Sequence, residues 1–175
     1  MIGDIIETIA DHVRFREQYF QTEIYSMLII EKAQKDDLKT ILELQYLAYQ
    51  SEARLFNDQN IPPLKQTIED LVSEFEKGIV LKATDESNAI IGSVRAYAEN
   101  GSAYISKLMV YPHKQGCGIG TQLLSAIEKE YPGCRCELYT STKSIGNIRL
   151  YERLGYRIFK QVPVTEELQF VYLEK

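Results

Sequence analysis

The stretch from Ile105 to Thr121 most constrains how this chain can fold, because an apolar run there leads through a proline into a turn dense in glycine. The run includes Leu108, Met109 and Val110 and predicts a buried strand, and Pro112 cannot donate a hydrogen bond to a sheet. After the turn, apolar residues recur with helical spacing at Ile119, Leu123, Leu124 and Ile127. The stretch therefore predicts a strand, a tight turn and an amphipathic helix.

The turn has the properties of an anion-binding loop. The first four N–H groups of a helix lack intrahelical partners, and the helix dipole places partial positive charge beside them. Glycine lets such N–H groups come close to a phosphate. The phosphate-loop pattern G-x-x-x-x-G-K-[ST] is absent, and G-x-G-x-x-G starting at Gly116 would need glycine at Thr121. The pattern that fits is Gln115-x-x-Gly118-x-Gly120.

Preceded by Leu108-x-Val110-x-Pro112, this pattern resembles the acetyl-CoA-binding motif [QR]-x-x-G-x-[GA] of the GNAT family of N-acetyltransferases. The resemblance implies that acetyl-CoA is the co-substrate and that the amides of the loop hold its diphosphate. The cofactor-binding residues that it implies are Leu108, Met109, Val110, Gln115, Gly116, Cys117, Gly118, Ile119, Gly120 and Thr121. The alternative is a plain glycine-rich turn.

A second segment, KSIGNIRLYERLGY, resembles the closing motif of the same family, N-x-x-A-x-x-L-Y-x-x-x-G-[FY]. Ser144 stands where Asn is usual, and Asn147 stands where Ala is usual. The resemblance implies that Asn147 contacts the cofactor. It also implies that Tyr151 lies beside the thioester sulfur, where a phenol can donate a hydrogen bond or a proton to the departing thiolate. The alternatives are an asparagine that satisfies its own helix end and a tyrosine packed in the core.

Apolar periodicity along the rest of the chain predicts a single α/β domain over residues 27–175. Strands are expected at 28–32, 79–84, 90–98, 103–110, 134–140, 156–162 and 168–173, and helices at 38–47, 67–75, after the glycine turn and at 144–154. Residues 49–64 are expected to form a short helix or loop. The resemblance implies a mixed, mostly antiparallel sheet flanked by helices, with a splay between the fourth and fifth strands.

Residues 1–26 are expected to form an N-terminal amphipathic helical extension outside that domain. Its apolar residues fall on one helical face: Ile2, Ile5, Ile6, Ile9 and Val13. Three interpretations stay open, namely a helix that packs on the domain or on a neighbouring subunit, an upstream or added extension, and a regulatory element.

Charge and cysteine content narrow the classes of partner. The net charge of −5 argues against nucleic acid and is compatible with cationic amines. Three cysteines, Cys117, Cys134 and Cys136, are too few and too clustered for a disulfide framework, which indicates a reducing, cytoplasmic setting. With the two histidines they lack the spacing of a zinc site, so no metal is expected. No apolar stretch has the length of a membrane span, so no membrane association is expected.

By resemblance, the chain is expected to move an acetyl group from acetyl-CoA to a primary amine of a small molecule or protein, by direct transfer in a ternary complex. The alternative is a non-catalytic sensor module that binds coenzyme A. The acceptor, the length of the acyl group and the oligomeric state are left open, with a homodimer as one option.

The general base is the least defined part of this expectation. Many family members carry a glutamate on the strand equivalent to residues 103–110, which holds no carboxylate here. Glu99 is the catalytic candidate by location, and Glu137, Tyr97, Tyr104 or a water chain are alternatives. Arg95, on the preceding strand, is expected to pair with Glu99, or else to bind an acidic group of the acceptor.

Overall fold

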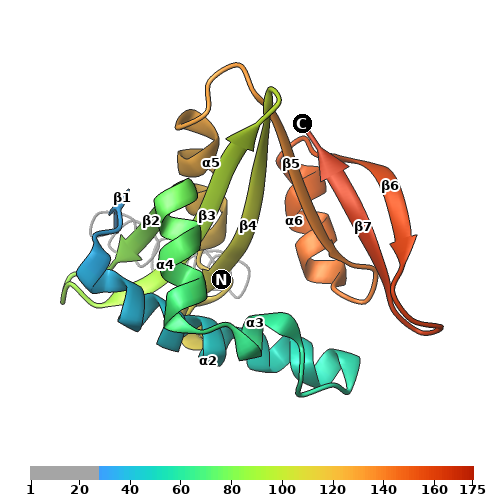
Figure 1. Cartoon of the computed structure of the whole chain (residues 1–175), viewed down its shortest axis with the longest axis horizontal. Helices are drawn as coiled ribbons and strands as arrows, with labels where there is room; N and C mark the ends of the chain where they lie inside the picture. The colour runs from blue at the N-terminus through green and yellow to red at the C-terminus, as the bar shows by residue number, and fades with distance from the viewer. Residues whose placement is uncertain (1–27) are drawn as a thin grey trace, which may run out of the picture.

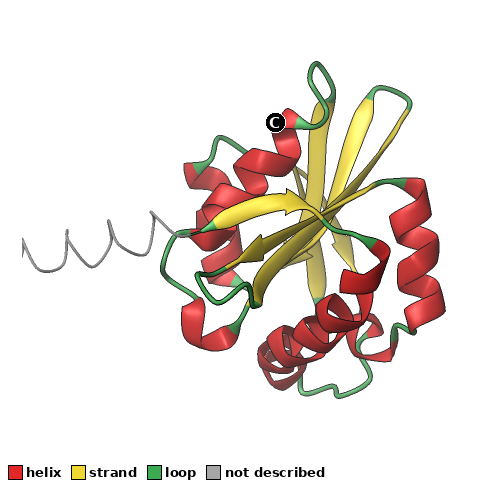
Figure 2. Cartoon of the chain, turned by 90° about the vertical axis from the view of Figure 1, so that its left-hand side faces the viewer, coloured by secondary structure: helices red, strands yellow, loops and turns green. Residues whose placement is uncertain are grey.

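The fold is a seven-stranded mixed sheet with helices on both faces, seen in a computed structural model that describes residues 28–175 (Figures 1 and 2). The strands are β1 (Ile29–Lys32), β2 (Ile79–Thr84), β3 (Ile90–Glu99), β4 (Ser102–Val110), β5 (Arg135–Ser141), β6 (Arg157–Pro163) and β7 (Gln169–Glu174). The helices are η1 (Lys35–Asp37), α2 (Leu38–Phe56), α3 (Pro62–Lys65), α4 (Ile68–Lys77), η2 (Pro112–Lys114), α5 (Ile119–Lys129) and α6 (Ile145–Arg153). The extension expected over residues 1–26 lies outside the described residues.

The sheet has the order β1-β2-β3-β4-β5-β7-β6, and every neighbouring pair is antiparallel except β4 and β5. These two parallel strands pair from Ser102 to Tyr104 on β4 and from Arg135 to Glu137 on β5. Beyond that point the two strands no longer pair with each other, and Figure 1 shows them diverging toward the end where α2 lies. The predicted fold is therefore confirmed, and the unpaired ends of β4 and β5 are called the splay below.

Two apolar clusters hold the helices on opposite faces of the sheet. On one face, α5 and α6 bury Leu123, Leu124, Ile127 and Tyr151 against the central and C-terminal strands. On the other face, α2 and α4 bury a cluster with the outer strands and Met109 of β4: Ala33, Leu38, Ile41, Leu42, Leu44, Leu71, Val80 and Met109. The splay thus lies between two layers of helices. In the part of the chain from 28 to 175, no helix is both long and apolar enough to cross a membrane.

The helix α2 is longer than its sequence pattern predicted. The expected end at Leu47 is wrong, since α2 runs to Phe56 and ends at Asn57, which adopts the left-handed conformation with φ of 54°. Leu47, at the expected end, is 50% exposed and does not belong to the inward face. The inward face continues instead through Gln45, Tyr49 and Ala53, where polar atoms interrupt the apolar pattern.

A bulge shapes β4 just before the glycine turn. Ser93 of β3 pairs with Met109, while Arg95 pairs with Ser106, so β4 carries one more residue than β3 between these two pairs. Lys107 lies in this interval with φ of 51°, an uncommon conformation for a residue with a side chain. Bulges bend a strand and redirect its side chains, and this one lies on the part of β4 that β5 has left.

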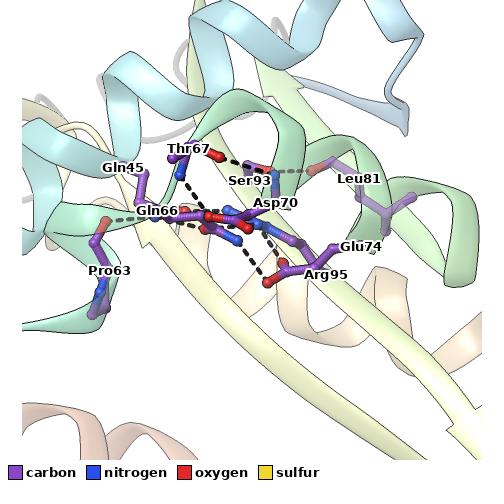
Figure 3. A network of polar contacts seen from close by, with 9 residues as sticks. All are labelled: Gln45, Pro63, Gln66, Thr67, Asp70, Glu74, Leu81, Ser93 and Arg95. Carbon is purple, nitrogen blue, oxygen red and sulfur yellow. Dashed lines mark hydrogen bonds and ion pairs between the residues drawn. The ribbon is translucent and has the colours of Figure 1, made fainter.

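A buried polar network joins α2 and α4 to β3 (Figure 3). The guanidinium of Arg95 donates from Nη1 to Glu74 Oε2 at 2.5 Å and from Nη2 to Gln45 Oε1. Gln66 links the two helices, since it accepts from Gln45 Nε2 at 2.9 Å and donates to Glu74 Oε1 at 2.6 Å. The expected pairing of Arg95 with Glu99 is wrong, because the side chain turns under α4. The network fixes α2 along the sheet.

Replacing Glu74 with alanine should lower the free energy of unfolding by about 2 kcal/mol, because hydrogen bonds to charged groups contribute roughly 1.5–3 kcal/mol and Glu74 is partly exposed. Urea denaturation measures this change. Glu76→Ala, on the exposed face of the same helix, is the matched control and should stay within about 0.5 kcal/mol of the parent protein. Equal stability of the two variants would show that the network does not hold α4 in place.

Candidate active site

The glycine turn between β4 and α5 presents a run of free backbone amides. Gly116 and Gly118 both have φ of 79°, and Gly118 is the N-cap of α5. Within residues 28–175, the N–H groups from Gly116 to Thr121 donate no hydrogen bond, and intrahelical bonding starts with Gln122 N to Gly118 O at 3.1 Å. Because these amides lie at a helix N-terminus, they form a site of positive potential suited to an anion.

The turn is held firmly at the end of the sheet. The N–H of Tyr111 donates to Ile91 O at 2.7 Å, and the side chain of Gln115 donates from Nε2 to Val110 O at 3.2 Å. Ile119 is buried in the core, whereas Cys117 and Thr121 are partly exposed. The loop therefore enters α5 in one defined direction, with its amides outside the core.

The predicted cofactor residues of β4 lie on the part of the strand that no longer pairs with β5. Met109 packs on the α2 side, while Leu108 and Val110 pack against the α5 and α6 side. One edge of β4 pairs with β3 up to Val110, but along the other edge no strand from residues 28–175 lies beside it after Tyr104. A free strand edge offers N–H and C=O groups to an extended ligand.

Gly120 marks where this edge approaches α6. A Cβ atom placed on Gly120 would lie 3.8 Å from Val110 Cγ2 and 3.9 Å from Leu150 Cδ2. The start of α5, the end of β4 and the middle of α6 thus meet at this glycine. Tyr151 is the residue of α6 that follows Leu150, so it belongs to the helix that meets the start of α5.

Tyr151 is 7% exposed, and its ring lies 6.0 Å from the ring of Tyr156, measured between centroids. Its hydroxyl makes no hydrogen bond to any residue from 28 to 175. The oxygen is not fully enclosed by the protein. Burial, with a smaller contribution from the negative charge of Glu52, raises the pKa of this phenol above its ordinary value. Tyr151 is therefore protonated at neutral pH, and its hydroxyl can donate a hydrogen bond to a ligand.

Asn147 connects the two helical layers through the sheet. Its Nδ2 donates to Glu52 Oε1 at 3.3 Å and lies 3.5 Å from Thr140 Oγ1. Glu52 belongs to α2 and Asn147 to α6, which lie on opposite faces. A hydrogen bond between such helices is feasible only where the strands separate. The structure thus sets the predicted cofactor residue Asn147 against a carboxylate.

Glu52 is a site residue that the sequence patterns did not reveal. Burial raises the pKa of its carboxyl above the ordinary value, although Lys107 and the hydrogen bond from Asn147 partly offset this. A signal was present in the sequence, since Gln45, Tyr49 and Glu52 are spaced by four and three residues and share one helical face. The expected helix ended before this stripe did.

The two glutamates suggested by location, Glu99 and Glu137, lie at the end of the sheet where β4 and β5 pair. Glu99 is exposed and pairs with Ser102 at the β3–β4 hairpin, at the end where β4 and β5 are joined. Glu137 is opposite Tyr104 in the last pair of that junction, and it accepts from Arg135 Nη2 at 2.8 Å. The structure does not bring Glu99 to the glycine turn, which follows the opposite end of β4. Its assignment as the base stays a prediction.

Comparison with known proteins assigns this chain to a family. The sequence model described as "Acetyltransferase (GNAT) family" matches residues 36–156, which include the glycine turn and Tyr151. The chain belongs to the GNAT acetyltransferase family. Membership implies acyl-transfer chemistry, with acetyl-CoA as the co-substrate. No curated protein matches the chain in sequence.

Solved structures of GNAT enzymes share the fold. The ribosomal-protein-S18-alanine N-acetyltransferase of Escherichia coli is 17% identical, with a TM-score of 0.69 over 85% of this chain and 92% of that chain. The PaiA N-acetyltransferase of Thermoplasma acidophilum, in complex with coenzyme A, is 20% identical, with a TM-score of 0.68 over 85% and 98%. A phosphinothricin acetyltransferase of Sinorhizobium meliloti, in complex with AcCoA, is 18% identical, with a TM-score of 0.68 over 85% and 88%.

The residues of the GNAT site fit coenzyme A in kind. The free amides from Gly116 to Thr121 suit a diphosphate, and the unpaired edge of β4 suits a chain that carries amide groups.

Among residues 28–175, no group of three or more His, Cys, Asp or Glu side chains is placed to hold a metal ion.

Replacing Gly118 with valine should weaken the binding of coenzyme A by at least about tenfold, measured by calorimetry. A β-branched residue rarely tolerates φ of 79°, so the turn and its amides must shift. Gly133→Val is the matched control, because Gly133 has φ of 80° in open space in the turn before β5. Both variants should lose similar stability. Equal affinity of the two for coenzyme A would contradict the assignment of the turn.

Proposed function

We propose that this GNAT protein transfers an acetyl group directly from acetyl-CoA to a primary amine of a small molecule or protein, with both substrates bound together. The observation that carries the proposal is the splay. Its free β4 edge ends in the amide turn, and α6, the helix that carries Tyr151, meets the start of α5 at Gly120. Binding at one end and a proton donor close by are what acyl transfer from a bound thioester requires.

In this proposal the amides from Gly116 to Thr121 hold the diphosphate, and the β4 edge pairs with the pantetheine arm. The arm would then replace the strand pairing that β4 and β5 have lost. A backbone N–H near Met109 or Val110 donates to the thioester oxygen, where negative charge develops during attack. This alignment lowers the entropy cost of bringing amine and thioester together.

Tyr151 supplies the hydrogen bond to the departing sulfur. Its raised pKa keeps the phenol protonated at neutral pH, so the donor is always present. The same raised pKa makes the phenol a weaker acid than a thiol. Tyr151 therefore stabilises the thiolate chiefly by hydrogen bonding, and a net proton transfer is completed as the attacking nitrogen releases its own proton.

The test of the proposal is acetyl-CoA turnover across a panel of amines that includes a polyamine, free amino acids, an aminoglycoside and peptides with free N-termini. Release of free thiol is followed against a reaction without amine. We expect saturable release with at least one amine, and mass spectrometry of that product should show one added acetyl group. Tight binding of coenzyme A with background release for every amine would instead indicate a non-catalytic sensor.

The Tyr151→Phe variant should lower kcat by about 100-fold or more, because a positioned proton donor contributes roughly 10²–10⁴-fold. Affinity for coenzyme A should stay within about twofold, since the ring remains. Tyr156→Phe is the matched control: that hydroxyl is buried and bonds to Glu128 Oε1 at 2.8 Å, away from the splay. It should lose stability and keep kcat. Unchanged turnover in Tyr151→Phe would remove this role.

A further inference from the structure

The α2 helix delivers one carboxylate to the splay. Gln45, Tyr49 and Glu52 form a stripe along α2, with spacings of four and three residues. The Gln45 end of the stripe is fixed by the Arg95 network (Figure 3). Because the network clamps the helix about two turns before Glu52, it fixes the position from which the Glu52 side chain starts.

Glu52 reaches through the splay to the helix that carries Tyr151. Its Oε1 accepts from Asn147 Nδ2 at 3.3 Å, and Asn147 and Tyr151 are four residues apart on one face of α6. Among residues 28–175, Glu52 makes no ion pair within 4.0 Å, and its Oε2 accepts no hydrogen bond. That oxygen is not fully enclosed either, so it is available to a ligand.

The groups that interact electrostatically with Glu52 come from α2, β4, β5 and α6. They are Tyr49, Lys107, Tyr139 and Tyr151, which interact with the charge of Glu52 and, apart from Lys107, are neutral phenols of raised pKa. Lys107 Nζ lies over the ring of Tyr49, 5.9 Å from its centroid, and burial lowers its pKa. Burial raises the pKa of the Glu52 carboxyl above its ordinary value, which makes the carboxylate a stronger proton acceptor.

We propose that Glu52 binds the ammonium group of the acceptor and takes its proton, so that the acceptor is a cationic alkyl amine that arrives from the α2 side of the sheet. The inference rests on the proposed acetyl transfer and adds to it the proton acceptor and the place where the amine binds. Tyr139, 49% exposed on β5, interacts electrostatically with Glu52 and is an aromatic ring accessible from solvent. Aromatic faces and a carboxylate together favour a cation.

The proton balance is simple. The ammonium R–NH₃⁺ gives one proton to the Glu52 carboxylate, and the freed nitrogen lone pair forms the N–C bond to the thioester carbonyl carbon. The C–S bond breaks, and its electron pair leaves with the sulfur. The second nitrogen proton passes to that sulfur through Tyr151 and solvent, which yields the amide and free thiol. Glu52 then releases its proton to water.

This role answers the difficulty that an alkyl ammonium with a pKa near 10 has only about one neutral molecule in a thousand at pH 7. Glu99 would meet the same need in principle. It is separated from Tyr151 by the paired junction of β4 and β5, whereas Glu52 is electrostatically coupled to Tyr151.

The test compares Glu52→Gln with Glu43→Gln and Glu99→Gln, using an amine that the parent protein acetylates. The glutamine at position 52 can still accept from Asn147, so the variant should fold and bind coenzyme A like the parent. Glu43 is exposed on the same helix, nine residues or about two and a half turns away, and therefore faces outward. We expect kcat/KM at pH 7 to fall about 100-fold for Glu52→Gln and less than about threefold for the control Glu43→Gln, while Glu99→Gln tests the alternative base.

The pH profile separates a proton acceptor from a structural residue. Without Glu52, only free neutral amine reacts, so kcat/KM of the variant should rise about tenfold per pH unit between pH 7 and 9. The parent should rise less steeply over that range. With an amine of similar size that is already neutral at pH 7, parent and variant should differ by less than about fivefold.

Several results would overturn the inference. A Glu52→Gln variant with the parent's kcat/KM and pH slope excludes Glu52 as the acceptor of the proton, and a 100-fold loss in Glu99→Gln alone assigns that role to Glu99. A loss in Glu52→Gln that persists with the neutral amine indicates a structural effect. If the parent protein itself releases no thiol with any amine, the proposed function fails first, and this inference fails with it.

Discussion

The site depends on the loss of pairing between β4 and β5 after Tyr104 and Glu137. A continuous sheet would separate α2 from α6, and it would satisfy both edges of β4. Because the two strands diverge, one edge of β4 is free beside the amide turn, and a side chain of α2 can bond to a side chain of α6. Ligand binding and contact between the two layers thus have one structural cause.

The position of α2 has its own physical origin. Arg95 is buried beneath the helices, and an unpaired guanidinium there would be strongly unfavourable. Glu74, Gln66 and Gln45 satisfy most of its donors, which ties three separate segments to β3 (Figure 3). A network of this kind specifies geometry more than it adds stability. Its consequence here is that α2 presents Glu52 to the splay.

The surroundings of Tyr151 and Glu52 divide the chemistry between them. Burial raises the pKa of both groups, but the consequence for proton transfer differs between a phenol and a carboxyl. The phenol is held protonated and can only donate. The carboxyl becomes a stronger proton acceptor than an ordinary carboxylate in water. Two groups on opposite faces of the sheet can play these complementary parts because they are coupled through the splay.

The sequence by itself determined the strands, the glycine turn and the identity of Tyr151 as a candidate, since these follow from local periodicity, backbone freedom and a contiguous motif. It did not determine the end of α2, where the polar atoms of Tyr49 and Glu52 on the inward face interrupted the apolar pattern. The approach of Glu52 to Asn147 was decided by the tertiary structure alone. These residues are 95 positions apart in the chain, and the contact exists because non-local strand pairing ends where it does.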